Sequence, residues 1–221
     1  MLNWSRLTLL DEVPSVRAVA DARVAVLASG EGTNLQALLD DPIVGPWVVL
    51  AVSDRANARA LERARSHEVE TVFLDPSAHD RVSFDRALHE VLLERSIDVV
   101  ALAGFMRIVG PDVVHAFAGR ILNVHPALLP AFPGTTSVAD ALAWGVKLTG
   151  VTVHFVDEEV DHGPIVFQDA VPVLPSDDWD SLEERVHEAE HRLLPAAIRA
   201  LVEGRITIEG RIVRVLEKAP A

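Results

Sequence analysis

Blocks of apolar residues alternate with amphipathic stretches along most of the chain, beginning near residue 23. Residues 24–28 form a β-branched apolar run, residues 29–34 are rich in glycine, and residues 35–40 carry apolar side chains at helical spacing. The same order recurs, with predicted strands at 48–53, 70–74, 97–102 and 120–124 and predicted helices at 58–66, 84–94 and from 111 onward. Strands that are apolar on both faces and alternate with helices predict an α/β fold with a doubly wound, mostly parallel central sheet flanked by helices.

The pattern changes beyond residue 145. Two extended runs, 148–156 and 164–173, are joined by an acidic segment and predict further strands with different pairing. A long helix is predicted over 182–203, opened by Ser181 and Glu184 as a capping box. Short apolar runs on either side of Glu209 and Gly210 predict a closing hairpin.

Composition and charge narrow the classes of function. The 221 residues suit one domain, and 49% hydrophobic against 24% charged residues gives enough material for a core. A net charge of −13 argues against nucleic acid or an anionic membrane as partner, although a small anion can still be held locally. The absence of cysteine excludes disulfides, thiolate metal sites and cysteine nucleophiles.

The first 22 residues stand apart from this pattern. A short apolar patch at residues 7–10 is broken at once by Asp11 and Glu12, which is too early for a signal-peptide core. No apolar run approaches the roughly 18 residues that a membrane-spanning helix needs. We therefore expect a cytoplasmic protein with an N-terminal extension, residues 1–22, and a single domain over residues 23–221.

A glycine-rich loop follows the first predicted strand. Glycines at such a turn let backbone N–H groups converge on an anion, at the N-terminus of the next helix. The loop is neither a P-loop nor a dinucleotide fingerprint, because no Gly-Lys-Ser/Thr follows and Leu35 replaces the third glycine. A phosphate monoester suits it, provided that Glu31 points away, and the alternative is a tight turn without a ligand.

Asn123 and His125 lie at the end of a predicted parallel strand, where ligands bind in such sheets. Two positions apart in extended chain, their side chains point to one side. An imidazole there can move a proton, and an amide N–H can stabilise an oxyanion. The alternative is a histidine that caps a buried loop.

The acidic segment 157–163 can supply a carboxylate that raises the pKa of the imidazole, although Asp157, Glu158 and Glu159 also suit a solvated turn.

Residues 187–191 read His-Glu-Ala-Glu-His, which matches the H-E-x-x-H pattern of zinc peptidases. Glu209 is available downstream as a third ligand. The pattern is short, however, and the same helix carries a conventional apolar stripe, so we treat zinc as the distant alternative and expect no metal.

Taken together, several motifs resemble the phosphoribosylglycinamide formyltransferase family, folate-dependent enzymes of purine synthesis. The similar stretches are residues 24–38 (VAVLASGEGTNLQAL), 102–108 (LAGFMRI), 123–126 (NVHP), 128–130 (LLP), 153–156 (VHFV), 161–164 (DHGP) and 190–191 (EH). They occur in order and cover the chain from about residue 23 to the closing hairpin. Residues 134–138 depart from the family, since many relatives carry a histidine shortly after Pro-Gly.

The resemblance implies formyl transfer from 10-formyltetrahydrofolate to the amine of phosphoribosylglycinamide, with no metal. It implies that Gly32, Thr33, Asn34 and Glu190 bind the phosphate-bearing substrate. The N-terminal half of the domain is expected to bind that substrate, and the C-terminal half to bind folate and carry out catalysis. Folate binding falls on Arg81, Met106, Arg107, Ile108, Val109 and Asn123, and the catalytic residues are His125, Asn123 and Asp161.

In the implied mechanism the amine attacks the formyl carbon directly. Asn123 and protonated His125 stabilise the oxyanion, His125 relays a proton to the folate nitrogen, and Asp161 keeps the imidazole charged. The alternatives are a deformylase or another folate formyltransferase of this fold, and a ligand-binding module without turnover. The hydrophobic content permits a homodimer without requiring one.

Overall fold

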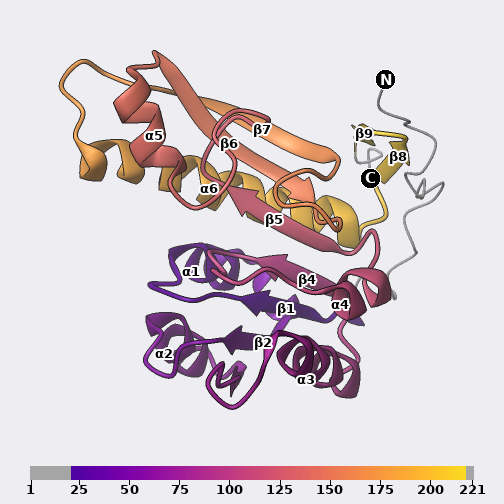
Figure 1. Cartoon of the computed structure of the whole chain (residues 1–221). Coiled ribbons are helices and arrows are strands. Elements are labelled where there is room, and N and C mark those ends of the chain that lie inside the picture. The colour runs from indigo at the N-terminus through magenta and orange to yellow at the C-terminus, as the bar shows by residue number, and fades with distance from the viewer. Residues whose placement is uncertain (1–20, 218–221) are drawn as a thin grey trace.

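Seven strands form one twisted sheet in the computed structural model, which describes residues 21–217. The strands are β1 (Val24–Leu27), β2 (Val48–Ser53), β3 (Glu70–Phe73), β4 (Val99–Leu102), β5 (Ile121–His125), β6 (Leu148–Phe155) and β7 (Ile165–Pro172). Their order is β3-β2-β1-β4-β5-β6-β7 (Figure 1). The first five pair in parallel, whereas β6 and β7 pair antiparallel, as the change of pattern beyond residue 145 predicted.

Helices cover both faces of the sheet. They are α1 (Thr33–Asp40), α2 (Arg59–Ser66), α3 (Arg81–Glu94), α4 (Pro111–Ala116), α5 (Ser137–Trp144) and α6 (Trp179–Val202), with a short 3-10 helix, η3 (Gly45–Trp47). Alternate side chains of β1 pack on opposite faces of the sheet, because successive side chains of a strand point to opposite sides. Val24 and Val26 pack with α1, α2 and α6, whereas Ala25 and Leu27 pack with α3 and α4. The doubly wound α/β fold is confirmed.

Two local predictions need correction. The capping box of α6 lies three residues earlier than expected: the Asp178 side chain accepts from the Ser181 N–H, and the Ser181 hydroxyl accepts from the Asp178 N–H. Ser181 is therefore inside the helix, which begins at Trp179. Helix α5 was not predicted, and its N-cap Thr136 makes no side-chain capping hydrogen bond.

The chain closes with a hairpin of β8 (Ile206–Glu209) and β9 (Ile212–Val215), as predicted, and this hairpin forms a separate two-stranded sheet. Of the expected N-terminal extension, residues 1–20 lie outside the described residues. Across residues 21–217, no helix is long and apolar enough to span a membrane.

Candidate active site

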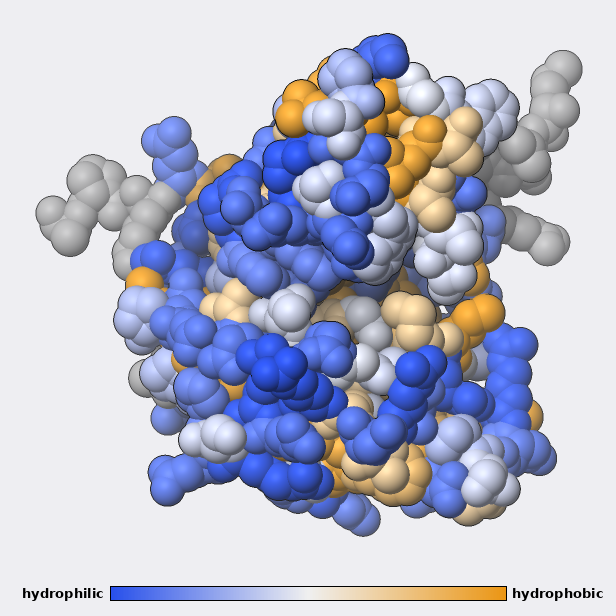
Figure 2. Space-filling view, turned by 90° about the vertical axis from the view of Figure 1, so that its left-hand side faces the viewer, coloured by the Kyte–Doolittle hydropathy of each residue, from blue (hydrophilic) through white to orange (hydrophobic). Residues whose placement is uncertain are grey.

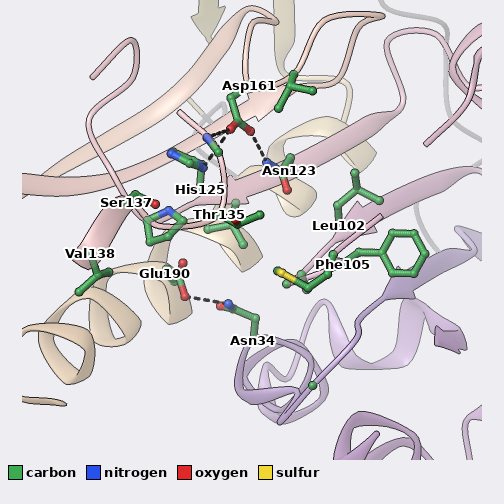
Figure 3. A pocket seen from close by; sticks show the side chains of 18 of the residues that line it. Asn34, Leu102, Phe105, Asn123, His125, Thr135, Ser137, Val138, Asp161 and Glu190 are labelled. Carbon is green, nitrogen blue, oxygen red and sulfur yellow. Dashed lines mark hydrogen bonds and ion pairs between the residues drawn. The ribbon is translucent and has the colours of Figure 1, made fainter. Parts of the chain in front are cut away.

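A cleft of about 830 Å³ opens where the carboxyl ends of β1, β4 and β5 meet the loops that follow them. In Figure 2 the hollow separates two largely hydrophilic masses and exposes less polar residues between them. Figure 3 shows that its side chains come from segments distant in sequence. The lining includes residues 30–34 after β1, 102–109 after β4, 123–126 of β5 and beyond, 134–139 before and within α5, 156–161 after β6, and Glu190 of α6.

The glycine-rich loop forms one end of the cleft. Gly32 is the N-cap of α1 and has a φ of 70°, in the left-handed region that favours glycine. A Cβ at this position would lie 2.7 Å from Ala60 of α2, so the close approach of the two segments also requires glycine. No side chain caps the N-terminus of α1, and Glu31 pairs with Arg59 (3.1 Å). The loop can therefore present free N–H groups to an anion.

Glu190 faces the same loop from α6. Its Oε2 accepts a hydrogen bond of 2.8 Å from Asn34 Nδ2, and both side chains are buried. Burial raises the pKa of Glu190 to about 7, although the hydrogen bond from Asn34 lowers it. This contact joins the first and last helices of the domain and places a titratable group beside the glycine-rich loop (Figure 3).

His125 ends β5 and is almost fully buried. Its Nε2 lies 2.8 Å from the Phe132 carbonyl, which can only accept, so Nε2 carries a hydrogen. Its Nδ1 lies 3.5 Å from Asp161 Oδ2. Burial lowers the pKa of His125, while Asp161 and the Phe132 carbonyl raise it, and the net shift is downward. The expected effect of a carboxylate is thus present but is outweighed by burial.

Asp161 lies in the loop between β6 and β7, with a φ of 53°. Its Oδ2 accepts a hydrogen bond of 2.7 Å from the Gly134 N–H, and its Oδ1 lies 3.4 Å from Asn123 Nδ2. Burial acts to raise the pKa of Asp161, but the nearby His154 ring, the hydrogen bond from the Gly134 N–H and the charge of His125 leave it lowered. The structure therefore places an ionised carboxylate next to the side chains of Asn123, His125 and His154.

His154 is a member of this network that the sequence analysis missed. Its Nδ1 donates to the Phe155 carbonyl (2.7 Å), so Nε2 is free to accept from Asn123 Nδ2 (3.1 Å). It lies in the apolar run of β6, directly opposite Asn123 in the sheet. A histidine in such a run looks like a core residue, and only the strand pairing shows what it faces.

The segment after β4 lines the other end of the cleft, with Met106 and Ile108 both more than half exposed. Ser29 Oγ accepts from the Met106 N–H (2.9 Å), which fixes one end of the segment. At the other end the buried carboxylate of Asp85, also missed from sequence, accepts from the N–H groups of Gly110 (2.8 Å) and Asp112 (3.1 Å).

The two arginines expected at the folate site differ in position. Arg107 is among the residues that line the cleft, and its guanidinium carbon lies 4.4 Å from the centre of the Phe84 ring, a cation–π distance. Arg81 is exposed at the first turn of α3 and does not contribute to the cleft lining. Every other residue expected to bind substrate, bind folate or act in catalysis does contribute to it.

The three residues that the zinc alternative requires as ligands do not come together. His187 and His191 stack on one face of α6, with ring centres 5.9 Å apart, but Glu209 pairs with Arg214 (2.9 Å) on the terminal hairpin. Among residues 21–217, no three histidine, aspartate or glutamate side chains are grouped so that they could hold a metal ion.

Comparisons with known proteins show the class to which this fold and cleft belong. Residues 22–198 match the family described as Formyl transferase, so the chain belongs to that family. It is 48% identical over 194 residues to the phosphoribosylglycinamide formyltransferase of Mycobacterium tuberculosis H37Rv, covering 87% of this chain and 90% of the relative. It is 43% identical to the human trifunctional purine biosynthetic protein adenosine-3, over 89% of this chain and 20% of that protein.

A solved structure supports the same assignment. The glycinamide ribonucleotide transformylase 1 of Symbiobacterium toebii has 50% sequence identity and a TM-score of 0.86, covering 90% of this chain and 95% of its own. The fold, with its parallel strands followed by two antiparallel ones, is therefore that of the formyltransferases.

Proposed function

We propose that this protein transfers a formyl group from 10-formyltetrahydrofolate to the amine of phosphoribosylglycinamide in purine synthesis. The observation that carries the proposal is the shared cleft: the glycine-rich loop and the His125, Asn123 and Asp161 network open onto the same cavity of about 830 Å³. That volume lies within the 300–1,000 Å³ range of ligand pockets. The activity named for the relatives at 48% and 50% identity supports it.

The glycine-rich end is our candidate site for the sugar phosphate. The N–H groups of Gly32, Thr33 and Asn34 lie at the N-terminus of helix α1, where the positive end of the helix dipole favours an anion. Glu190 lies within hydrogen-bonding distance of Asn34 and is placed to contact the glycinamide part of the same substrate. This arrangement requires Glu31 to point away, and its ion pair with Arg59 supports that requirement.

The segment after β4 is our candidate site for the folate. Met106, Ile108 and Val109 offer apolar side chains to a flat ring, and Arg107 offers a cation to the glutamate of the folate. Asn123 lies opposite Leu102 at the end of β4 and lines the same cleft, and we propose that the formyl carbon and the amine meet beside it. We assign Arg81 only a peripheral role, because it does not line the cleft.

In the mechanism that we propose, the amine attacks the formyl carbon and the carbonyl oxygen becomes an oxyanion. Asn123 and the protonated His125 stabilise that oxyanion, which replaces the Phe132 carbonyl as the acceptor at His125 Nε2, and His125 passes a proton to the departing folate nitrogen. Asp161 supports the charged imidazole from 3.5 Å. The amine loses a proton as the new C–N bond replaces the old one, so the transfer is balanced without a covalent enzyme intermediate.

A formyl-transfer assay tests this proposal and separates it from the deformylase alternative. Loss of 10-formyltetrahydrofolate is followed by absorbance with and without phosphoribosylglycinamide. We expect turnover that depends on the amine substrate and yields one formylated product for each folate released. Folate release at the same rate without the amine would indicate a hydrolase, and binding of both ligands without turnover would indicate a binding module.

The remaining proposals concern the whole protein. We infer that residues 23–221 form one formyltransferase domain, with the phosphate site in its N-terminal half and catalysis in its C-terminal half. The net charge of −13 supports the absence of nucleic acid or an anionic membrane as partner, and we propose a cytoplasmic location for the enzyme. A homodimer is compatible with the two sheet edges, β3 and β7, and sedimentation equilibrium would determine the oligomeric state.

A further inference from the structure

The loop that carries Asp161 is held by contacts from outside the cleft. Its backbone turns sharply, because Asp161 has a φ of 53°, a conformation that costs a side-chain-bearing residue about 1–2 kcal/mol. Such a conformation persists only where neighbouring contacts fix it. The next residue, His162, is where those contacts converge.

Arg211 of the terminal hairpin holds His162 in two ways. It lies in the turn between β8 and β9, and its Nη2 donates to the His162 carbonyl oxygen. Its Nη1 lies 3.2 Å from Nε2 of the His162 ring. The other ring nitrogen, Nδ1, lies 2.8 Å from Asp157 Oδ2, at the start of the same loop. One arginine thus fixes both the backbone and the side chain of the residue after Asp161.

A second contact to the same loop comes from α4. Glu158 Oε1 lies 2.7 Å from His115 Nε2 of α4, and both side chains are about two-thirds exposed. An exposed pair of this kind contributes little on its own. The Arg211 contacts are also exposed, but they reach a backbone carbonyl and a ring that Asp157 holds as well, and both come from one rigid planar group.

We propose that Arg211 is a positioning residue for Asp161, so that the terminal hairpin contributes to catalysis. The hairpin lies beyond residues 22–198, the part that matches the family. Arg211 touches no substrate in this proposal; it keeps the Asp161 carboxylate 3.5 Å from His125 Nδ1. A misplacement of about 1 Å in such a site can reduce turnover by about a hundredfold. The inference rests on the proposed function.

The test is Arg211→Ala in the full-length protein, with Arg214→Ala as the matched control. Arg214 belongs to the same hairpin and pairs with the exposed Glu209. We expect Arg211→Ala to lower kcat by about tenfold or more, which corresponds to about 1.4 kcal/mol in the barrier. We expect KM for both substrates to change by less than about twofold, because the binding ends of the cleft are intact.

The pH profile separates positioning from a loss of structure. Charged groups that face His125 are Asp161, which raises its pKa, and His154, which lowers it. With Asp161 displaced, the limb of the kcat profile that depends on His125 moves to lower pH. Arg211→Lys keeps a donor for the His162 carbonyl and should recover part of kcat. A wild-type kcat and pH profile in Arg211→Ala, or an equal loss in Arg214→Ala, would overturn the proposal.

Two further outcomes are distinguishable. Should Arg211→Ala fail to fold, His162→Ala removes the ring contacts with Arg211 and Asp157 but keeps the bond from Arg211 to the backbone carbonyl, so a smaller fall in kcat with a pH shift in the same direction is expected. Wild-type values in that variant would contradict the proposal. A wild-type protein without formyl transfer would instead overturn the proposed function itself.

Discussion

At the scale of single residues, burial and charge act in opposite directions on one proton of His125. A neutral imidazole has a single N–H, and the Phe132 carbonyl takes it at Nε2. Nδ1 then presents a lone pair to the Asp161 carboxylate 3.5 Å away, which favours a second proton. Burial disfavours the resulting charge and lowers the pKa overall. The imidazolium is therefore favoured most when a developing oxyanion is nearby.

Replacement of His125 by alanine tests this role. We expect His125→Ala to lower kcat by about 10²–10⁴-fold, the usual contribution of a positioned acid or base. Folate binding should stay within a few-fold, because the segment after β4 is untouched. Turnover and an equilibrium titration with folate measure the two effects. His67→Ala, at an exposed histidine outside the cleft, should behave as wild type. Near-normal turnover without His125 would remove it from the mechanism.

Glu190 predicts a pH dependence of stability. Its pKa is raised from 4.5 to about 7, so the folded protein holds a proton that the unfolded chain releases. This stabilisation is complete below pH 4.5 and is lost as pH rises through about 7. The shift corresponds to at most about 3 kcal/mol. The free energy of unfolding, measured by denaturant at pH 4.5 and 8, should therefore fall more in wild type than in Glu190→Gln. Parallel curves would contradict the shifted pKa.

At the scale of elements, the turn between β1 and α1 depends on one glycine. Gly32 combines a left-handed φ of 70° with a Cβ position only 2.7 Å from Ala60. Neither α1 nor α2 can shift independently, because both pack on the same face of the sheet. The geometry of the candidate phosphate site is therefore set by the packing of two helices as much as by the loop itself.

We expect Gly32→Ala to lower the free energy of unfolding by about 2 kcal/mol or more, from the left-handed backbone and the contact with Ala60. Gly30→Ala is the matched comparison, since a Cβ there has no neighbour within 4 Å. We expect Gly30→Ala to change stability by less than about 0.5 kcal/mol. Chemical denaturation of both variants measures this difference. Equal free energies of unfolding would show that the loop accommodates the added Cβ at position 32.

Periodicity predicted most elements because each buried strand and each amphipathic helix satisfies a local pattern. It failed for α5, whose buried side chains are Ser137, Val138 and Ala141 and so give only a weak apolar pattern. It misplaced the cap of α6, because Ser181-Glu184 and Asp178-Ser181 both fit the capping pattern and the choice is made by the observed hydrogen bonds.

The candidate site was predictable where motifs follow strands, as with Gly32 and His125. His154 and Asp85 could not be recognised in this way. The role of His154 depends on its position opposite Asn123 across β5 and β6, and that of Asp85 on the approach of α3 to the N-terminus of α4. Both roles depend on tertiary packing, and the pattern of a single strand or helix does not indicate them.

At the scale of the whole molecule, the cleft is built from both halves of the chain. The glycine-rich loop comes from the first βα unit, whereas Glu190 and Asp161 come from the last third. A substrate that touches both halves stabilises the folded state and has no comparable site in the unfolded chain. Ligand binding is therefore linked to global unfolding.

This linkage predicts a thermal shift. At a concentration 100 times its Kd, phosphoribosylglycinamide should add about 2.7 kcal/mol to the free energy of unfolding. For a chain of this size the midpoint should rise by about 5–10 °C in a thermal unfolding scan. The analogue without phosphate, at the same concentration, should give a much smaller rise. An equal rise with both compounds would argue against the phosphate site at the glycine-rich loop.

The hydrogen bond between Asn34 and Glu190 joins residues 156 positions apart in the chain. During synthesis, the loop at residues 30–34 leaves the ribosome long before α6 is available to pack against it. A domain generally folds as a unit, and this contact cannot form before α6 has been made. The cleft is therefore complete only when α6 docks against the loop. Catalytic competence is consequently absent from a nascent chain that lacks α6.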